Sequence, residues 1–167
     1  MSEPASESSG GDESPQHWKF GPEDEPVLVE NAEAVLAHLP FFMGGWPVRW
    51  AGSSLDADAG EPDIRIVDLG DDAWRVVSTG PGEADFSFDN TYDAANGLAG
   101  ALISVFVARR ADTVCLHAGA VVIGGGLVIV VGDSFAGKSS VALHLAVLGH
   151  RFFGDDQIAV SLAEEPV

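Results

Sequence analysis

Residues 127–148, LVIVVGDSFAGKSSVALHLAVL, constrain the fold more than any other part of the chain. The uncharged run 127–131, in which four of five residues are β-branched, predicts a strand. A glycine-rich turn follows, and after it apolar residues recur at the spacing of a helix. The residues expected on the inner face of that helix are Val141, Ala142, Leu145 and Leu148. Strand, glycine-rich turn and helix in this order predict an α/β fold.

The turn matches the phosphate-binding pattern G-x-x-x-x-G-K-[ST]. Amides of such a turn, together with the start of the following helix, attract the phosphates of a nucleotide. The candidate binding residues are Gly132, Asp133, Ser134, Phe135, Ala136, Gly137, Lys138, Ser139 and Ser140. Lys138 supplies positive charge between the outer phosphates, and the Ser139 hydroxyl is a candidate ligand of the accompanying Mg²⁺. The alternative is a glycine-rich turn whose lysine caps a surface helix.

Two acidic residues, Asp155 and Asp156, follow Lys138 by 17 and 18 positions. A strand returning from the helix would bring them beside the glycine-rich turn. There they could hold Mg²⁺, with Asp155 as the metal ligand, or accept a proton from an attacking hydroxyl. The alternative is a Gly-Asp-Asp turn between two strands.

His117 is a further catalytic candidate. If the glycine triplet 124–126 turns a hairpin centred on Gly125, paired positions add up to 250, and His117 lies opposite Asp133. A histidine on an apolar strand can equally be a core residue whose polar atoms are satisfied.

Charge and cysteine content exclude several classes of function. The net charge of −18, from 26 acidic residues against 8 Lys and Arg, argues against nucleic-acid binding. The acidity reflects either a high-salt cytoplasm or a solubility device. A single cysteine, Cys115, excludes an intramolecular disulfide and predicts a reducing, cytoplasmic setting. No membrane span is expected, because glycines interrupt the uncharged stretch 113–131 and the apolar run 94–108 is too short.

The rest of the chain is expected to form a tail and an accessory domain. Residues 1–26 predict a disordered acidic tail, residues 27–111 an α+β accessory domain, and residues 112–167 a partial nucleotide-binding domain. The accessory domain is expected to contain a helix over 31–42 ended by Pro40, and a helix over 90–110 capped by Asn90 or Thr91. Short antiparallel strands are predicted in 47–52, 63–70, 73–80 and 83–90. The tryptophans Trp46, Trp50 and Trp74 are expected in its core.

The pieces LHAG, VVGDS, GKSSVALHL, GHR and DD occur in this order between residues 116 and about 160. In this stretch the sequence resembles the HPr kinase/phosphorylase family and its related HPr-kinase-like serine kinases. The resemblance implies the mixed sheet of that family's phosphate-loop domain and a transfer of phosphate from ATP to a serine or threonine of a partner protein, HPr-like or other. It also implies that Lys138 binds the β-phosphate and that Ser139 binds Mg²⁺. Asp155 and Asp156 would serve the metal and the serine proton, and His117 would lie near the transferred phosphate.

Two departures accompany the resemblance. Phe135 stands where bifunctional members usually carry glycine, which favours the kinase-like branch. Only 11 residues follow Asp156, so the back of such a domain, with its further metal ligand and partner-binding elements, is not expected here. The main alternative function is therefore a catalytically inactive ATP-binding sensor or scaffold. A small-molecule kinase or NTPase is a further alternative, which rests on the phosphate loop alone. Oligomeric state stays open, with a homo-oligomer among the alternatives.

Overall fold

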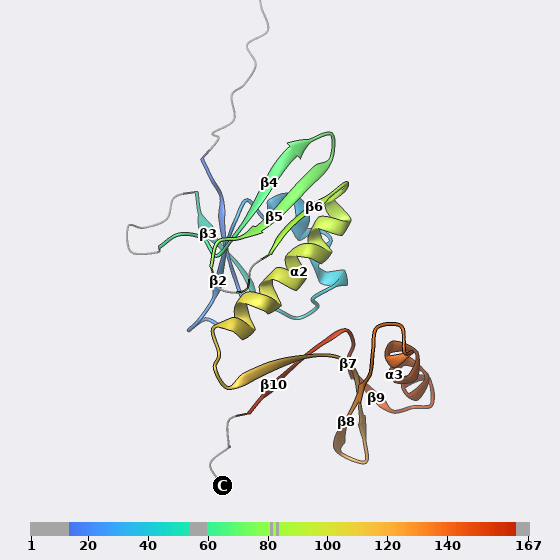
Figure 1. The fold of residues 1–167 in the computed structure, drawn as a ribbon. Helices are drawn as coiled ribbons and strands as arrows, with labels where there is room; N and C mark the ends of the chain where they lie inside the picture. Colours follow the sequence, from blue (N-terminus) through green and yellow to red (C-terminus); the bar gives the residue numbers. More distant parts are fainter. Residues whose placement is uncertain (1–13, 54–59, 81, 83, 163–167) are drawn as a thin grey trace, which may run out of the picture. The chain divides into compact units, whose positions relative to one another are not determined.

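The computed structural model describes residues 14–53, 60–80, 82 and 84–162. These residues form two compact units, one ending at Ala108 and the other beginning at Arg109. Figure 1 shows both along the chain, coloured from blue at its beginning to red at its end. Each unit has its own sheet, so the two are described separately.

The first unit is built on a six-stranded sheet in the order β3-β1-β2-β4-β5-β6. Its strands are β1 (His17–Phe20), β2 (Val27–Glu30), β3 (Val48–Gly52), β4 (Ile64–Gly70), β5 (Ala73–Ser78) and β6 (Asp85–Phe88). Neighbouring strands are antiparallel except β2 and β4, which run parallel. The predicted strands correspond to β3–β6, and the antiparallel pairing of β4, β5 and β6 is confirmed.

Strand β1 corrects the prediction for the start of the chain. A disordered tail over residues 1–26 is wrong at His17–Phe20, where β1 pairs with both β2 and β3. Phe20 is fully buried and His17 is only 5% exposed. Four residues are too few to display a clear two-residue period, and this strand is stabilised by partners that local sequence does not reveal. Residues 1–13 of the expected tail lie outside the described residues.

The segment 31–42 forms two short helices where one was expected. Helix α1 covers Glu33–Leu36, and the 3-10 helix η1 covers Leu39–Phe41. Pro40 does not end the first helix but lies in the first turn of η1, where its missing N–H leaves no hydrogen bond unmade. Both helices contribute to the core through the buried residues Val35 and Leu39.

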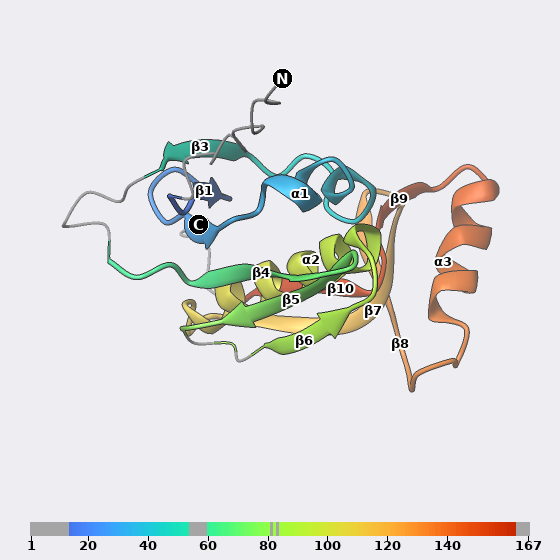
Figure 2. The same ribbon diagram turned by 90° about the horizontal axis from the view of Figure 1, so that it is seen from above.

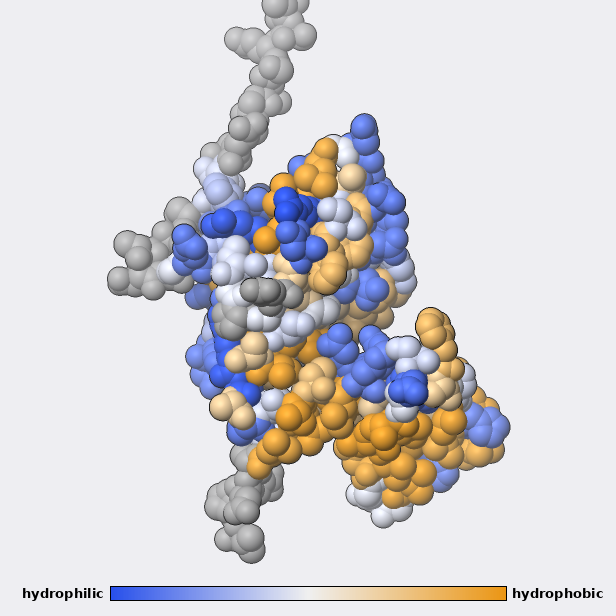
Figure 3. Space-filling model, viewed as in Figure 1, coloured by the Kyte–Doolittle hydropathy of each residue, from blue (hydrophilic) through white to orange (hydrophobic). Residues whose placement is uncertain are grey.

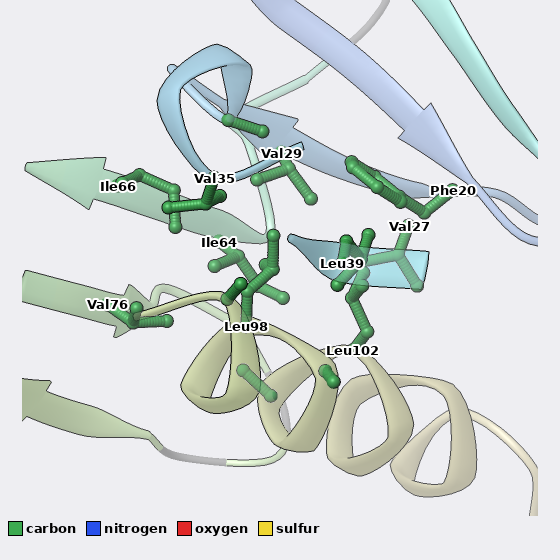
Figure 4. Close-up of a cluster of buried hydrophobic side chains, with 14 of the residues drawn as sticks. Phe20, Val27, Val29, Val35, Leu39, Ile64, Ile66, Val76, Leu98 and Leu102 are labelled. Carbon is green, nitrogen blue, oxygen red and sulfur yellow. The ribbon is translucent and has the colours of Figure 1, made fainter. Parts of the chain in front are cut away.

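Helix α2 (Thr91–Ala108) packs along the sheet and supplies much of the core. Asn90 is the residue that caps it, because its Oδ1 accepts a hydrogen bond from the Asp93 N–H at 2.8 Å. Figures 1 and 2 show α2 beside β5 and β6, which it contacts. In Figure 4, Leu98 and Leu102 point from α2 toward Ile64 and the other buried side chains of the sheet.

The length and apolar composition of α2 also fit a membrane-spanning helix. Its 18 residues are long enough and, with a mean hydropathy of 1.2, apolar enough to cross a membrane by length and composition alone. The helix reaches this length because it begins three residues before the apolar run 94–108, at Thr91. In this structure seven of its residues are buried in the first unit: Ala94, Ala95, Leu98, Ala99, Ala101, Leu102 and Val105. Among the tryptophans expected in the same core, Trp46 and Trp74 pack against it, whereas Trp50 is 64% exposed.

The second unit is organised around β7 (Thr113–Ile123), the longest strand in the described part of the chain. Strand β10 (Gln157–Ser161) pairs with the first half of β7, and β8 (Gly126–Val131) and β9 (Arg151–Gly154) pair with its second half. Helix α3 (Lys138–Val147) contacts β7, β8 and β9. The molecule is therefore of mixed α/β type, as predicted. The mixed strand directions occur in the first unit, however, while every described pair of the second unit is antiparallel.

We predict that Leu98→Ala destabilises the first unit by about 2–5 kcal/mol, because the fully buried leucine side chain is replaced by a cavity. All four tryptophans lie before Arg109, so tryptophan fluorescence in a urea titration reports on this unit. Leu69→Ala is the matched control, since Leu69 of β4 is 52% exposed. Equal effects of the two substitutions would contradict the assignment of α2 to the core.

Candidate functional site

A compact loop joins β8 to α3. The Ala136 N–H donates to the Asp133 carbonyl at 3.1 Å, which closes a turn at the start of the loop. Gly137 precedes the helix with φ of 87°, a left-handed conformation that glycine adopts at little cost. The first helical hydrogen bond runs from the Val141 N–H to the Gly137 carbonyl, so the amides before Val141 in the helix have no helical acceptor. Such amides can bind an anion.

Lys138 is the first residue of α3 and is 6% exposed. Its ammonium folds back and donates to the Asp133 carbonyl at 2.9 Å. The positive charge therefore lies against the turn that the loop forms. Low exposure leaves this charge less screened by water than an ordinary surface lysine, which strengthens its attraction for an anion.

The loop borders a cavity of about 410 Å³. Its lining residues are His117, Ser134, Phe135, Gly137, Lys138, Ser139 and Ser140. Six of the nine predicted loop residues thus line one cavity together with His117, whereas Gly132, Asp133 and Ala136 do not line it. Serine hydroxyls, loop backbone and one ammonium are suited to bind a small polyanion.

Phe135 is the strained residue of the loop. Its φ of 64° lies in the left-handed region, which is costly for a bulky side chain. The side chain is fully exposed, so no described packing compensates for this conformation. A glycine would adopt the same turn without strain.

His117 lies in β7, but not where the hairpin argument predicted. Strands β7 and β8 pair Ile123 with Gly126 and Ala118 with Val131, so paired positions add up to 249. The two-residue turn of Gly124 and Gly125, with φ of 59° and 84°, fixes this register. The predicted pairing with Asp133 is therefore wrong by one residue.

The partner of His117 is Gln157 of β10, and its side chain reaches the neighbouring aspartate. His117 Nε2 lies 3.3 Å from Asp156 Oδ1, with both side chains more than half exposed. The Ala118 N–H also donates to the Asp156 carbonyl at 3.2 Å, which holds the backbone of this aspartate beside β7. His117 and Asp156, two separately predicted candidates, thus form one pair.

Asp155 lies next to the start of α3. A Cβ built on Gly119 of β7 would be 3.3 Å from Asp155 Oδ1 and 3.1 Å from the Lys138 carbonyl oxygen. The Asp155 carboxylate and the first residue of α3 are therefore both close to the same point on β7. Asp155 and Asp156 do not line the cavity itself.

The oxygen donors at the site suit a hard cation that a bound ligand would also coordinate. Within the described ranges no three His, Cys, Asp or Glu side chains come together in a metal-binding group. Mg²⁺ usually binds through only one or two protein oxygens and completes its coordination with phosphates and water. The Asp155 carboxylate beside α3 and the Ser139 hydroxyl in the cavity fit that requirement.

Helix α3 is less buried than predicted. Of the four expected inner residues, Ala142 is buried and Leu145 half-buried, but Val141 is 45% and Leu148 63% exposed. Leu143 and Val147 are exposed as well, and Figure 3 shows hydrophobic residues, in orange, gathered on the second unit. The end of the helix is as predicted: Gly149 adopts φ of 97° and its N–H donates to the Ala146 carbonyl.

The two units differ sharply in charge. From Arg109 onward the chain has only 6 of its 26 acidic residues but 4 of its 8 Lys and Arg. The second unit is therefore close to neutral, and the large negative charge belongs to the first 108 residues. A nearly neutral unit repels a polyanion less than the average composition of the chain implies.

Two small residues at the site were not predicted as functional. Gly119 and Ala142 let β7 and α3 approach closely, because a Cβ on Gly119 would be only 3.0 Å from the Ala142 Cβ. The signal in the sequence is the run of small residues Ala118-Gly119-Ala120 in an otherwise bulky strand. This run does not by itself identify a contact, because the sequence does not show which face of the strand meets the helix.

We predict that Phe135→Gly stabilises the second unit by about 1 kcal/mol, since it removes left-handed strain and no packing. Gly137→Ala is the opposite change at the other left-handed position of the loop and is expected to destabilise by about 1–2 kcal/mol. Hydrogen exchange of second-unit amides measures both. Destabilisation by Phe135→Gly would mean that the aromatic ring packs in solution.

Cys115 offers a test of the position of Asp156. Partial burial raises the pKa of the Cys115 thiol, and the negative charge of Asp156 raises it further. Asp156→Asn is therefore expected to lower this pKa, because the thiolate no longer faces a negative charge. The pH dependence of alkylation measures it directly, since the chain has one cysteine. Asp133→Asn is the control, and an unchanged alkylation profile in Asp156→Asn would contradict the geometry.

Comparison with known proteins adds no assignment to this geometry. The chain matches no protein-family model, and neither the curated proteins nor the solved structures gave a match. The resemblance of residues 116–160 therefore stays a prediction.

Proposed function

We propose that the second unit binds ATP with Mg²⁺ and transfers the terminal phosphoryl group to a serine or threonine hydroxyl of a protein or peptide. The observation that carries the proposal is the cavity in which His117, Lys138 and the β8–α3 loop meet. A loop of this composition between a strand and a helix is suited to phosphate chains. The motifs of residues 116–160 add the resemblance to HPr-kinase-like serine kinases, with HPr-like or other proteins as partners.

Phosphate binding would use the loop and Lys138. The free amides at the start of α3 donate to phosphate oxygens, and the dipole of the helix adds to their attraction. The Lys138 ammonium already contacts the Asp133 carbonyl at 2.9 Å, so it needs only a small movement to bind a phosphate lying on the loop. By the resemblance, that phosphate is the β-phosphate.

Metal binding would use Ser139 and Asp155. Bound Mg²⁺ supplies charge neutralisation for the transferred phosphate. The Ser139 hydroxyl lines the cavity, and the Asp155 carboxylate lies close to the first residue of α3.

Proton transfer would use the pair His117 and Asp156. In the proposed step the acceptor oxygen forms a bond to the terminal phosphorus while the bond from phosphorus to ADP breaks. The hydroxyl proton passes to the Asp156 carboxylate, and the His117 imidazole, 3.3 Å away, orients that carboxylate. Because the side chains of both residues are more than half exposed, a polypeptide hydroxyl can approach them.

The second candidate function is an ATP-binding sensor or scaffold without catalysis. The exposed apolar residues of α3, among them Leu143, Val147 and Leu148, favour it. Apolar side chains exposed in number on one helix are typical of a surface that another polypeptide covers. In this reading nucleotide binding changes the affinity for a partner, and no phosphate is transferred.

We predict that Lys138→Ala lowers protein labelling from labelled ATP and Mg²⁺ in a cell extract by about 10²–10³-fold, because a preorganised charge on the phosphates is lost. Lys19→Ala is the matched control. It removes the only other lysine of the chain, an exposed residue of β1. Labelling by the wild type that Lys138→Ala does not reduce would contradict the proposal.

Calorimetry with ATP separates the two functions. Saturable binding without labelling would favour the sensor or scaffold. Absence of binding by a folded wild-type protein would overturn both.

A further inference from the structure

Gly119 has no side chain at a point where three elements meet. A Cβ built on it would lie 3.0 Å from the Ala142 Cβ, 3.1 Å from the Lys138 carbonyl oxygen and 3.3 Å from Asp155 Oδ1. These atoms belong to the first two turns of α3 and to the chain just after β9. Ordinary contacts of a carbon atom are about 3.5–4.0 Å. A methyl group at Gly119 would therefore be too close to all three.

Space, rather than backbone conformation, explains glycine at this position. Gly119 is part of the regular pairing of β7 with β8, opposite Val130, and it is not among the residues with positive φ. Any L-residue could adopt its backbone conformation. The close approach of α3 and Asp155 to β7 is what a larger residue would disturb.

We propose that Gly119 is a positioning residue, which sets the separation between the Asp155 carboxylate and the phosphate-binding start of α3. The inference rests on the function proposed above and extends it to a residue that contacts neither nucleotide nor metal. Lys138 and Ser139 move with α3, whereas Asp155 moves with β9, the strand that it directly follows. Both lie close to the point that a Cβ of residue 119 would occupy, so the missing side chain lets the two halves of the site lie this near to each other.

Alanine at this position would change that separation. The Ala142 Cβ and the Lys138 carbonyl belong to a helix, which moves as a body, whereas the exposed Asp155 side chain can rotate. The added methyl group is therefore accommodated by a small outward shift of α3 and a rotation of Asp155. Either movement weakens binding that requires Ser139 and Asp155 together, but it leaves the loop amides free to bind phosphate.

The test compares ADP binding with Mg²⁺ and with EDTA, by calorimetry on the full chain. We expect Gly119→Ala to lower ADP affinity in Mg²⁺ by about tenfold, a typical effect of disturbing the surroundings of a metal ligand. In EDTA the affinity should equal that of the wild type. Asp155→Asn should show the same pattern, and the double variant should bind no more weakly than Asp155→Asn alone.

Gly126→Ala is the matched control. Gly126 lies in β8 of the same sheet and has ordinary φ, and a Cβ there would meet only the Ile123 carbonyl oxygen, at 3.6 Å. Should Gly119→Ala fail to fold, adding Ala142→Gly removes the tightest contact and keeps the one with Asp155.

Three results would overturn the inference while leaving ATP binding intact. They are wild-type affinity in Gly119→Ala, an equal loss with and without Mg²⁺, and full additivity with Asp155→Asn. If the wild type binds ADP neither in Mg²⁺ nor in EDTA, the proposed function is overturned, and the inference with it.

Discussion

The second unit depends on the pairing of β7. Its three other strands all hydrogen-bond to this one strand, and α3 packs against it. The partners change near Ala118: before it β7 pairs with β10, and after it with β8 and β9. The polar side chains of the candidate site gather at this change, because the two aspartates between β9 and β10 and the loop after β8 lie beside it. One extended strand thus brings together residues that are 39 positions apart in the sequence, namely His117 and Asp156.

The two units differ in the size of their buried cores. The first has a continuous core in which α2, α1 and η1 cover the sheet. The second has a small cluster around Ala118, Ala120 and Ile158, and it leaves many apolar side chains of α3, β8 and β9 in contact with solvent. Burial of apolar surface is the main source of folding free energy, so the second unit holds less of it per residue. The candidate site therefore lies in the unit with the smaller buried core.

Sequence patterns predicted the local parts of this structure and missed the long-range ones. The β8–α3 segment, the cap at Asn90 and the strands β4–β6 follow from glycine positions, capping residues and alternation within short windows. Strand β1 was missed because four residues carry little periodicity and its neighbours lie far along the chain. The register at His117 was wrong by one residue because three consecutive glycines allow several turns. The role of Gly119 depends on a helix packing against a strand, which no single segment encodes.

The uneven distribution of charge has a kinetic consequence. Twenty of the 26 acidic residues precede Arg109, and the field they create reaches about one Debye length, roughly 10 Å at 0.1 M salt. The net charge of −18 repels an anionic nucleotide as it diffuses toward the chain. Its capture should therefore speed up as ionic strength rises, the reverse of an attraction between opposite charges, whereas a cationic polypeptide would be drawn in fastest in dilute buffer. The net charge of the chain thus selects among encounters by the sign of the charge on the approaching molecule.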